Sequence, residues 1–168
     1  MNIKDKLKNY LDEYLNPRES SLKRSFKANQ VGSSYEMTFQ EECATSINQF
    51  IDDNKEDETF QTKLFEYIDK KGLKDSEVYN KVYIDRRLFS KIRSNKDYHP
   101  SKETIILLGI ALELTENEIE DLLKSASYSL PMNTTFDLII RFCFKERIYD
   151  IDQINNFLYD YNCKLLCS

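Results

Sequence analysis

The chain has 168 residues and a formal net charge of −5, with 24 Lys and Arg against 29 Asp and Glu. Its 40% hydrophobic and 32% charged residues are the balance of a folded globular protein and argue against disorder. Only 3 Gly and 3 Pro are present. Because β-rich folds need turn residues at about every eight to twelve positions, this scarcity predicts an all-α fold.

Two features argue against a membrane or secreted protein. The longest nearly apolar run, Ile105 to Leu112, is far shorter than the roughly 20 residues of a membrane-spanning helix. The amino-terminal residues are charged throughout and lack the apolar core of a signal peptide. We therefore expect a cytoplasmic protein without a membrane partner.

The first predicted helix covers residues 3–15, where apolar side chains recur at helical spacing. Pro17 follows and ends the pattern, because proline cannot continue a helix. Residues 18–35 are rich in Ser, Lys and Asn, a composition that indicates a linker.

A second helix is predicted from Thr38, which stands at capping-box spacing from Glu41. Its apolar positions extend to Ile51. The acidic stretch 52–58 is too polar to be buried and marks a boundary. Residues 1–57 are therefore predicted to form amino-terminal helices and a linker.

Five short helices are predicted in residues 58–130. The first ends at Gly72, a residue that favours the left-handed position after a helix. The other four begin at residues whose side chains can accept a hydrogen bond from the first turn. These predicted caps are Asp75, Asp85, Ser101 and Thr115, the last forming a capping box with Glu118. The helix after Ser101 is the most continuously apolar and is expected to be the central buried element.

Beyond Pro131, two more amphipathic helices are predicted. Apolar residues recur at helical spacing from Phe136 to Phe144 and again from Ile151 to Tyr161. We interpret residues 131–168 as a two-helix carboxyl-terminal extension of the five-helix domain.

The segment from Asp75 to Asn95 carries the main functional signal, because it reads as a short helix, a turn and a second short helix. Val78, Ile84, Phe89 and Ile92 are its expected buried contacts. On the second helix, basic and small polar side chains occupy the opposite arc. Residues 81–102 hold seven basic and two acidic side chains, a net charge of +5 in an acidic chain. Such a local basic face is typical of nucleic-acid binding, although exposed helices also carry Lys and Arg for solubility alone.

On these residues the segment from about Phe60 to Tyr128 resembles the Cro/C1 (Xre-like) helix-turn-helix family. The run Ile84-Asp85-Arg86-Arg87-Leu88-Phe89-Ser90-Lys91-Ile92 is similar to the family's pattern around the cap and start of its third helix. The resemblance implies a five-helix repressor-like fold whose third helix enters the major groove, with Arg86, Arg87, Ser90 and Lys91 at base or phosphate positions. The full predicted DNA-binding set is Arg86, Arg87, Ser90, Lys91, Arg93, Asn95, Lys96 and Lys102.

A longer resemblance, from about Phe60 to Leu166, is to a bacterial family of unassigned function in which such a domain carries a short helical tail. It is carried by the segment from Asp75 through Ser101 and Lys102, and by the later Phe136-Asp-Leu-Ile-Ile140 and Tyr149-Asp-Ile-Asp-Gln-Ile-Asn155. It implies the domain and tail arrangement but no activity.

Two tyrosines depart from the helix-turn-helix pattern. Tyr79 replaces a small residue of the second helix, and Tyr83 stands where the family has a turn glycine. Because a tyrosine does not easily take the left-handed conformation that glycine accepts, we expect either a turn of different length or a different crossing angle.

Catalytic and metal sites are not expected. The glycines are too far apart to form a phosphate-binding loop, and the only histidine, His99, is interpreted as a loop residue that could contact a phosphate. The four cysteines lack zinc-site spacing and are expected to be reduced thiols. The acidic cluster at 52–58 is interpreted as solvated linker. No cofactor is predicted.

The sequence thus favours a non-enzymatic, sequence-specific DNA-binding transcriptional regulator acting on double-stranded DNA. Because one short helix reads few base pairs, a homodimer is expected. The alternative is a helical protein–protein interaction module, such as an adaptor or regulator in a bacterial defence or toxin-control system. Aromatic-rich helices, the acidic composition and the two tyrosines at the turn favour that alternative.

Overall fold

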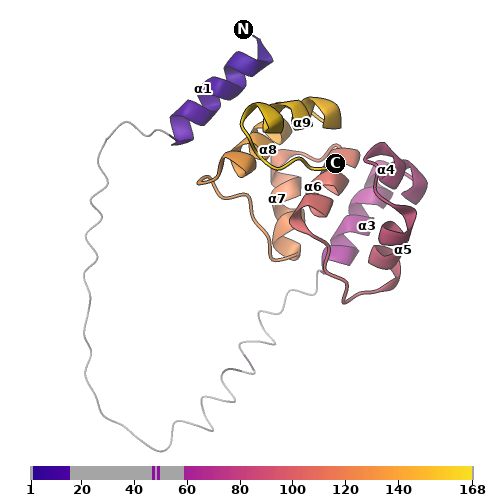
Figure 1. Ribbon diagram of the computed structural model, residues 1–168. Coiled ribbons are helices and arrows are strands. Elements are labelled where there is room, and N and C mark those ends of the chain that lie inside the picture. Colours follow the sequence, from indigo (N-terminus) through magenta and orange to yellow (C-terminus); the bar gives the residue numbers. More distant parts are fainter. Residues whose placement is uncertain (1, 16–46, 48, 50–58, 168) are drawn as a thin grey trace, which may run out of the picture. The chain divides into compact units, whose positions relative to one another are not determined.

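The computed structural model describes residues 2–15, 47, 49 and 59–167. Regular structure in these residues consists of eight α-helices and no strand (Figure 1). This confirms the all-α prediction for the described part of the chain. The predicted linker and the acidic boundary lie outside the described residues. Of the predicted second helix, the structure describes only Ile47 and Gln49, and both are helical.

The helices follow the order expected from the sequence. Helix α1 spans Ile3–Leu15. The others are α3 (Phe60–Lys71), α4 (Asp75–Lys81), α5 (Arg86–Ser94), α6 (Lys102–Ala111), α7 (Glu116–Ser125), α8 (Thr135–Lys145) and α9 (Ile151–Asp160).

Three of the four predicted caps are confirmed. The Asp85 carboxylate accepts the Arg87 N–H at 2.6 Å, and the Ser101 hydroxyl accepts the Thr104 N–H at 3.2 Å. At α7 the bonds are reciprocal: Thr115 N–H donates to Glu118 at 2.8 Å, and Thr115 Oγ1 accepts the Glu118 N–H. Each bond joins residues two or three apart, so sequence spacing suffices to predict it.

The predicted cap at Asp75 is wrong. The N-cap of α4 is Lys74, whose backbone N–H donates to the Glu77 carboxylate at 2.7 Å, and Asp75 is the first helical residue. The Asp75 carboxylate instead accepts from Arg93, 18 residues further along the chain, at 2.5 Å.

Six helices end in a tight turn whose last residue is left-handed, with φ between 49° and 65°. In each turn the following residue donates its N–H to a carbonyl five residues earlier, which satisfies the helix end and turns an apolar or aromatic residue inward. Only one of the six is glycine, so this chain repeatedly places side chains where glycine is preferred. The residues are Gly72, Tyr83, Glu113, Ser127, Arg147 and Asn162.

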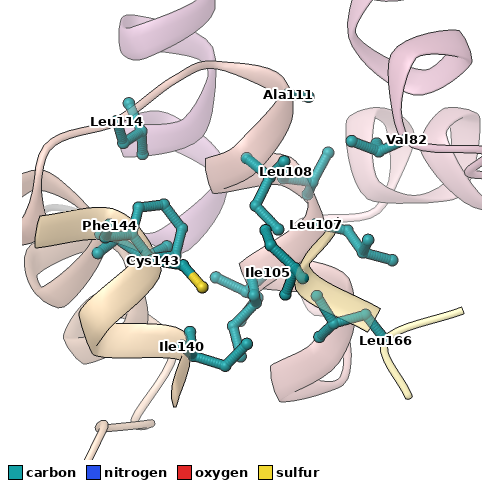
Figure 2. Close-up of a cluster of buried hydrophobic side chains, with 14 of the residues drawn as sticks. Val82, Ile105, Leu107, Leu108, Ala111, Leu114, Ile140, Cys143, Phe144 and Leu166 are labelled. Atoms are coloured by element: carbon teal, nitrogen blue, oxygen red, sulfur yellow. The ribbon is translucent and has the colours of Figure 1, made fainter. Parts of the chain in front are cut away.

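Helix α6 is the centre of the hydrophobic core, as the sequence predicted, since every residue from Ile105 to Ala111 is buried. It packs against α4 and α7. Figure 2 shows α6 side chains such as Ile105 and Leu108 beside Cys143 and Phe144 of α8, with Leu166 of the final segment nearby. The predicted carboxyl-terminal extension therefore shares one core with the five preceding helices.

Helix α1 packs on α8. Leu7, Tyr10 and Leu11 are its buried residues, and the Tyr10 ring lies 5.4 Å from that of Phe142. Although the sequence grouped this helix with residues 16–57, it contributes to the core of the helices that begin at Phe60. None of the described helices combines the length and apolar character needed to cross a membrane.

Candidate nucleic-acid interface

Helix α5 is divided into a buried and an exposed side. Asp85 caps its first turn, and Phe89 and Ile92, three residues apart, are 2% and 1% exposed. Val78 and Ile84 are buried as well, which confirms all four predicted contacts of the segment. The basic and small polar residues of α5 consequently lie on the side away from the core.

The turn between α4 and α5 accommodates Tyr83 at a position where glycine is preferred. The tyrosine itself takes the left-handed conformation, with φ of 56°. The Ile84 N–H donates to the Tyr79 carbonyl at 2.9 Å, and Ile84 is buried. The anchored isoleucine thus holds a glycine-type turn, and Tyr83 is left 75% exposed beside the basic helix.

Four residues of the predicted DNA-binding set are exposed and make no side-chain hydrogen bond, ion pair or ring contact with the described residues. Three carry a positive charge and the fourth carries a hydroxyl. These four side chains can therefore donate many hydrogen bonds, and none of them carries a negative charge. They are Arg86, Arg87, Ser90 and Lys96.

Two further residues of the set are exposed and make local contacts. The Lys91 ammonium lies 4.4 Å from the centre of the Tyr98 ring, a weak cation–π contact that leaves its charge uncompensated. The Asn95 side chain accepts the Asp97 N–H at 3.0 Å and shapes the loop after α5.

The last two cations of the set are paired with carboxylates. Arg93 Nη2 lies 2.5 Å from Asp75 Oδ1. Lys102 Nζ lies 2.5 Å from Asp137 Oδ1 of α8, with side chains 23% and 5% exposed. Among the described residues, six of the eight predicted residues are thus exposed without an ion-pair partner, and the other two are paired with carboxylates.

A groove of about 360 Å³ runs between α4 and α5. Tyr79 and Phe89 provide its aromatic lining, and the rings lie 5.6 Å apart. Its polar lining joins residues of the predicted DNA-binding set to others outside that set: Arg86, Ser90 and Arg93 from α5, and Lys74, Asp75 and Ser76 from the start of α4. The three α4 residues carry no local signal for a place in this groove, because only folding brings α4 beside α5.

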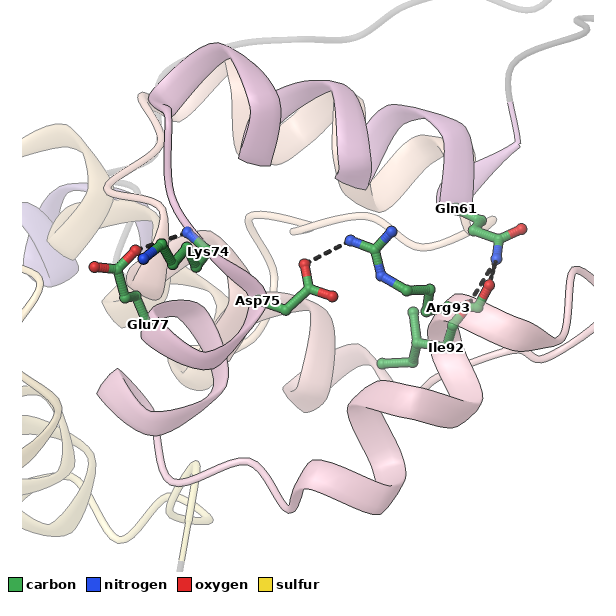
Figure 3. A network of polar contacts seen from close by, with 6 residues as sticks. All are labelled: Gln61, Lys74, Asp75, Glu77, Ile92 and Arg93. Carbon is green, nitrogen blue, oxygen red and sulfur yellow. Dashed lines mark hydrogen bonds and ion pairs between the residues drawn. The ribbon is translucent and has the colours of Figure 1, made fainter.

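Figure 3 shows a second feature that the sequence did not reveal. The Gln61 side chain of α3 donates to the backbone carbonyl oxygens of Ile92 and Arg93, at 3.0 and 2.5 Å. The Arg93 side chain turns toward Asp75 in the same view. The last turn of α5 is thus held by both α3 and α4.

Groups suited to other chemistry lie apart in the described residues. His99 is exposed and its ring lies 5.6 Å from that of Tyr128. Burial raises the pKa of the Cys143 thiol to about 12, so this sulfur is a protonated core group. No three metal-ligating side chains come together in the part of the chain that the structure describes.

Comparisons of this chain with protein-family models, curated proteins and solved structures find no match.

Proposed function

We propose that this protein is a sequence-specific DNA-binding regulator that inserts α5 into the major groove of a DNA duplex. The observation that carries the proposal is the exposed face of α5, where Arg86, Arg87 and Ser90 have no side-chain partner among the described residues, opposite the buried Phe89 and Ile92. The succession of helices from α3 to α7, with a tight turn before α5, supports the repressor-like fold implied by the sequence resemblance.

The dimensions of α5 suit such a groove. With its side chains an α-helix is about 10–12 Å across, and α5 has 9 residues. The major groove is about 12 Å wide and presents a distinct pattern of donors and acceptors for each base pair. A-form RNA is a poorer partner, because its major groove is too narrow for side chains to read.

Residue roles follow from position and bonding. Arg87 lies in the first turn and is assigned to a base edge, since a guanidinium can donate two parallel hydrogen bonds to guanine. Lys96, in the loop after α5, is assigned to a phosphate. Arg93 and Lys102 are excluded from direct contacts in this proposal, because Asp75 and Asp137 already neutralise them.

The test begins with selection of duplexes from a random library, followed by affinity measurements at several salt concentrations. The wild-type protein is expected to prefer a selected duplex over a scrambled one, with affinity falling as salt rises. Arg87→Ala should weaken specific binding by about 1–3 kcal/mol and relax the preference at one position. Lys96→Ala should lower the affinity for the selected and the scrambled duplex alike. It should also reduce the slope of log affinity against log salt concentration by about one.

Lys8→Ala is the matched control, because Lys8 is an exposed lysine of α1 and lies on a different helix. It should leave specific binding unchanged. The proposal fails if the wild-type protein binds no duplex at low salt, or if Arg87→Ala and Lys8→Ala behave alike. Sedimentation equilibrium with and without the selected duplex tests the homodimer that we propose as the binding species.

A protein-interaction module is the second candidate, and one observation favours it. Tyr83 is 75% exposed and precedes the first residue of α5 by three positions, and tyrosines are enriched in protein interfaces. Affinity capture with wild-type protein and with Tyr83→Ala distinguishes the two functions. A partner lost with Tyr83→Ala, together with absence of duplex binding, would favour the module.

A further inference from the structure

Arg93 belongs to the basic helix by sequence, but its contacts are with the protein. Its guanidinium lies between the Asp75 carboxylate, at 2.5 Å, and the Phe65 ring, whose centre is 4.0 Å from the guanidinium carbon. A guanidinium can bond a carboxylate along its edge and stack on an aromatic ring through its face. Both modes are used here, so the edge and the face of the Arg93 guanidinium are each engaged by the protein.

The backbone at the same position is also held. Gln61 donates to the carbonyl oxygens of Ile92 and Arg93, groups that have no partner inside a helix that ends at Ser94. Side chain and main chain of Arg93 are therefore both bonded to neighbouring helices. Gln61 and Phe65 come from α3, and Asp75 comes from α4.

Aromatic contacts continue this arrangement beneath the helix. The Phe65 ring meets the buried Phe89 ring of α5 edge to face, at 6.3 Å and 82°. Phe89 in turn lies 5.6 Å from Tyr79 of α4. The orientation of α5 thus depends on ring contacts with both α3 and α4.

Resting on the proposed function, we propose that Arg93 and Asp75, with Phe65 and Gln61, form a clamp that fixes the orientation of α5 for DNA binding. Arg93 is a positioning residue rather than a DNA contact. Its side chain is 51% exposed and that of Asp75 is 35% exposed, so the ion pair contributes little to folding stability. A clamp of this kind acts through preorganisation, since a misdirected helix must be reordered on binding.

The clamp and simple electrostatics predict opposite changes in the DNA affinity of Asp75→Asn. Removing an acidic group beside a basic helix should strengthen attraction to phosphates at any duplex. Loss of the clamp should instead weaken specific binding. Asp97→Asn is the matched control, because Asp97 is an exposed carboxylate of the adjacent loop whose side chain has no partner in the described structure.

The experiment measures the affinity of full-length variants for a duplex selected from a random library and for its scrambled version. Asp97→Asn should strengthen both affinities equally. Asp75→Asn should reduce the ratio of specific to scrambled affinity by roughly twofold to fivefold. Arg93→Lys, which keeps the charge but loses the planar fork and the stacking, should resemble Asp75→Asn, and the double variant should be no worse than either.

Two results would overturn the clamp. One is tighter binding by Asp75→Asn that matches Asp97→Asn. The other is wild-type specificity in Arg93→Lys, which would mark Arg93 as a cationic contact. Hydrogen exchange of the amides of Ile92 to Asn95 tests the clamp without DNA. Faster exchange in Asp75→Asn but not in Asp97→Asn supports it even if no duplex binds, whereas equal exchange rejects it while leaving the DNA proposal open.

Discussion

Replacing Tyr83 by glycine should stabilise the fold. Tyr83 has φ of 56° and is 75% exposed, so the substitution relieves a disfavoured backbone conformation while removing little buried surface. The left-handed conformation costs a residue with a side chain roughly 1–2 kcal/mol. Glycine offsets part of that gain by its larger conformational freedom in the unfolded chain, by roughly 0.5–1 kcal/mol. We therefore expect a net gain of about 0.5–1 kcal/mol.

Tyr159 provides a matched control because it is 74% exposed but lies within α9. The same substitution there introduces glycine into a helix and should destabilise the protein by about 0.5–1 kcal/mol. The two variants lose the same side chain at the same exposure and differ only in backbone conformation. Their unfolding free energies should consequently change in opposite directions.

Urea unfolding followed by circular dichroism measures both changes. The midpoint should rise for Tyr83→Gly and fall for Tyr159→Gly, with slopes unchanged from wild type. A loss of stability in Tyr83→Gly would refute the reasoning. It would mean that the tyrosine side chain makes a stabilising contact worth more than the backbone strain.

Three further predictions concern the core. Asp137→Ala leaves the largely buried Lys102 unpaired and should lower the free energy of unfolding in urea by about 3 kcal/mol. The control Asp152→Ala removes an exposed carboxylate and should lower it far less. Similar losses in the two variants would contradict the role of the ion pair. In iodoacetamide labelling at about pH 8 followed by peptide mass spectrometry, the half-buried Cys163 should react before Cys143, whose burial raises its pKa to about 12; early labelling of Cys143 would contradict this. Burial also raises the pKa of Tyr10 from 10.0 to about 12, as it raises that of Cys143 from 9.0. Because these groups lose their protons at lower pH in the unfolded chain than in the folded protein, the free energy of unfolding should fall as pH rises from about 9 toward 12. Urea midpoints across that range should drop in wild type and drop less in Tyr10→Phe; an equal drop would exclude a contribution from Tyr10.

The helices were predictable because their signals are local. Caps such as Asp85 and Ser101 bond amides two or three residues away, and the apolar stripes of α8 and α9 repeat at helical spacing. Asp75 shows where local reasoning fails. Its position suits a cap, but Arg93 binds its carboxylate, and Glu77 satisfies the Lys74 amide instead.

The α4–α5 turn shows the same contrast. The sequence places a tyrosine where glycine is preferred, and propensity alone predicts a different turn. Burial of Ile84 directly after it compensates for the cost of the left-handed conformation. Long-range packing thus overrides a local preference that the sequence does display.

The sequence by itself determined the all-α class, the capped helices from Phe60 onward and the concentration of basic residues in 81–102. Those features depend on composition and on neighbours within one or two helical turns. Only the tertiary structure decided which cations remain uncompensated at the surface. The partners of Arg93 and Lys102 are Asp75 and Asp137, 18 and 35 residues away, and packing of α4 and α8 brings them into contact. A charge is neutralised by whatever lies within a few ångströms of it, and no spacing along the chain reveals that distance.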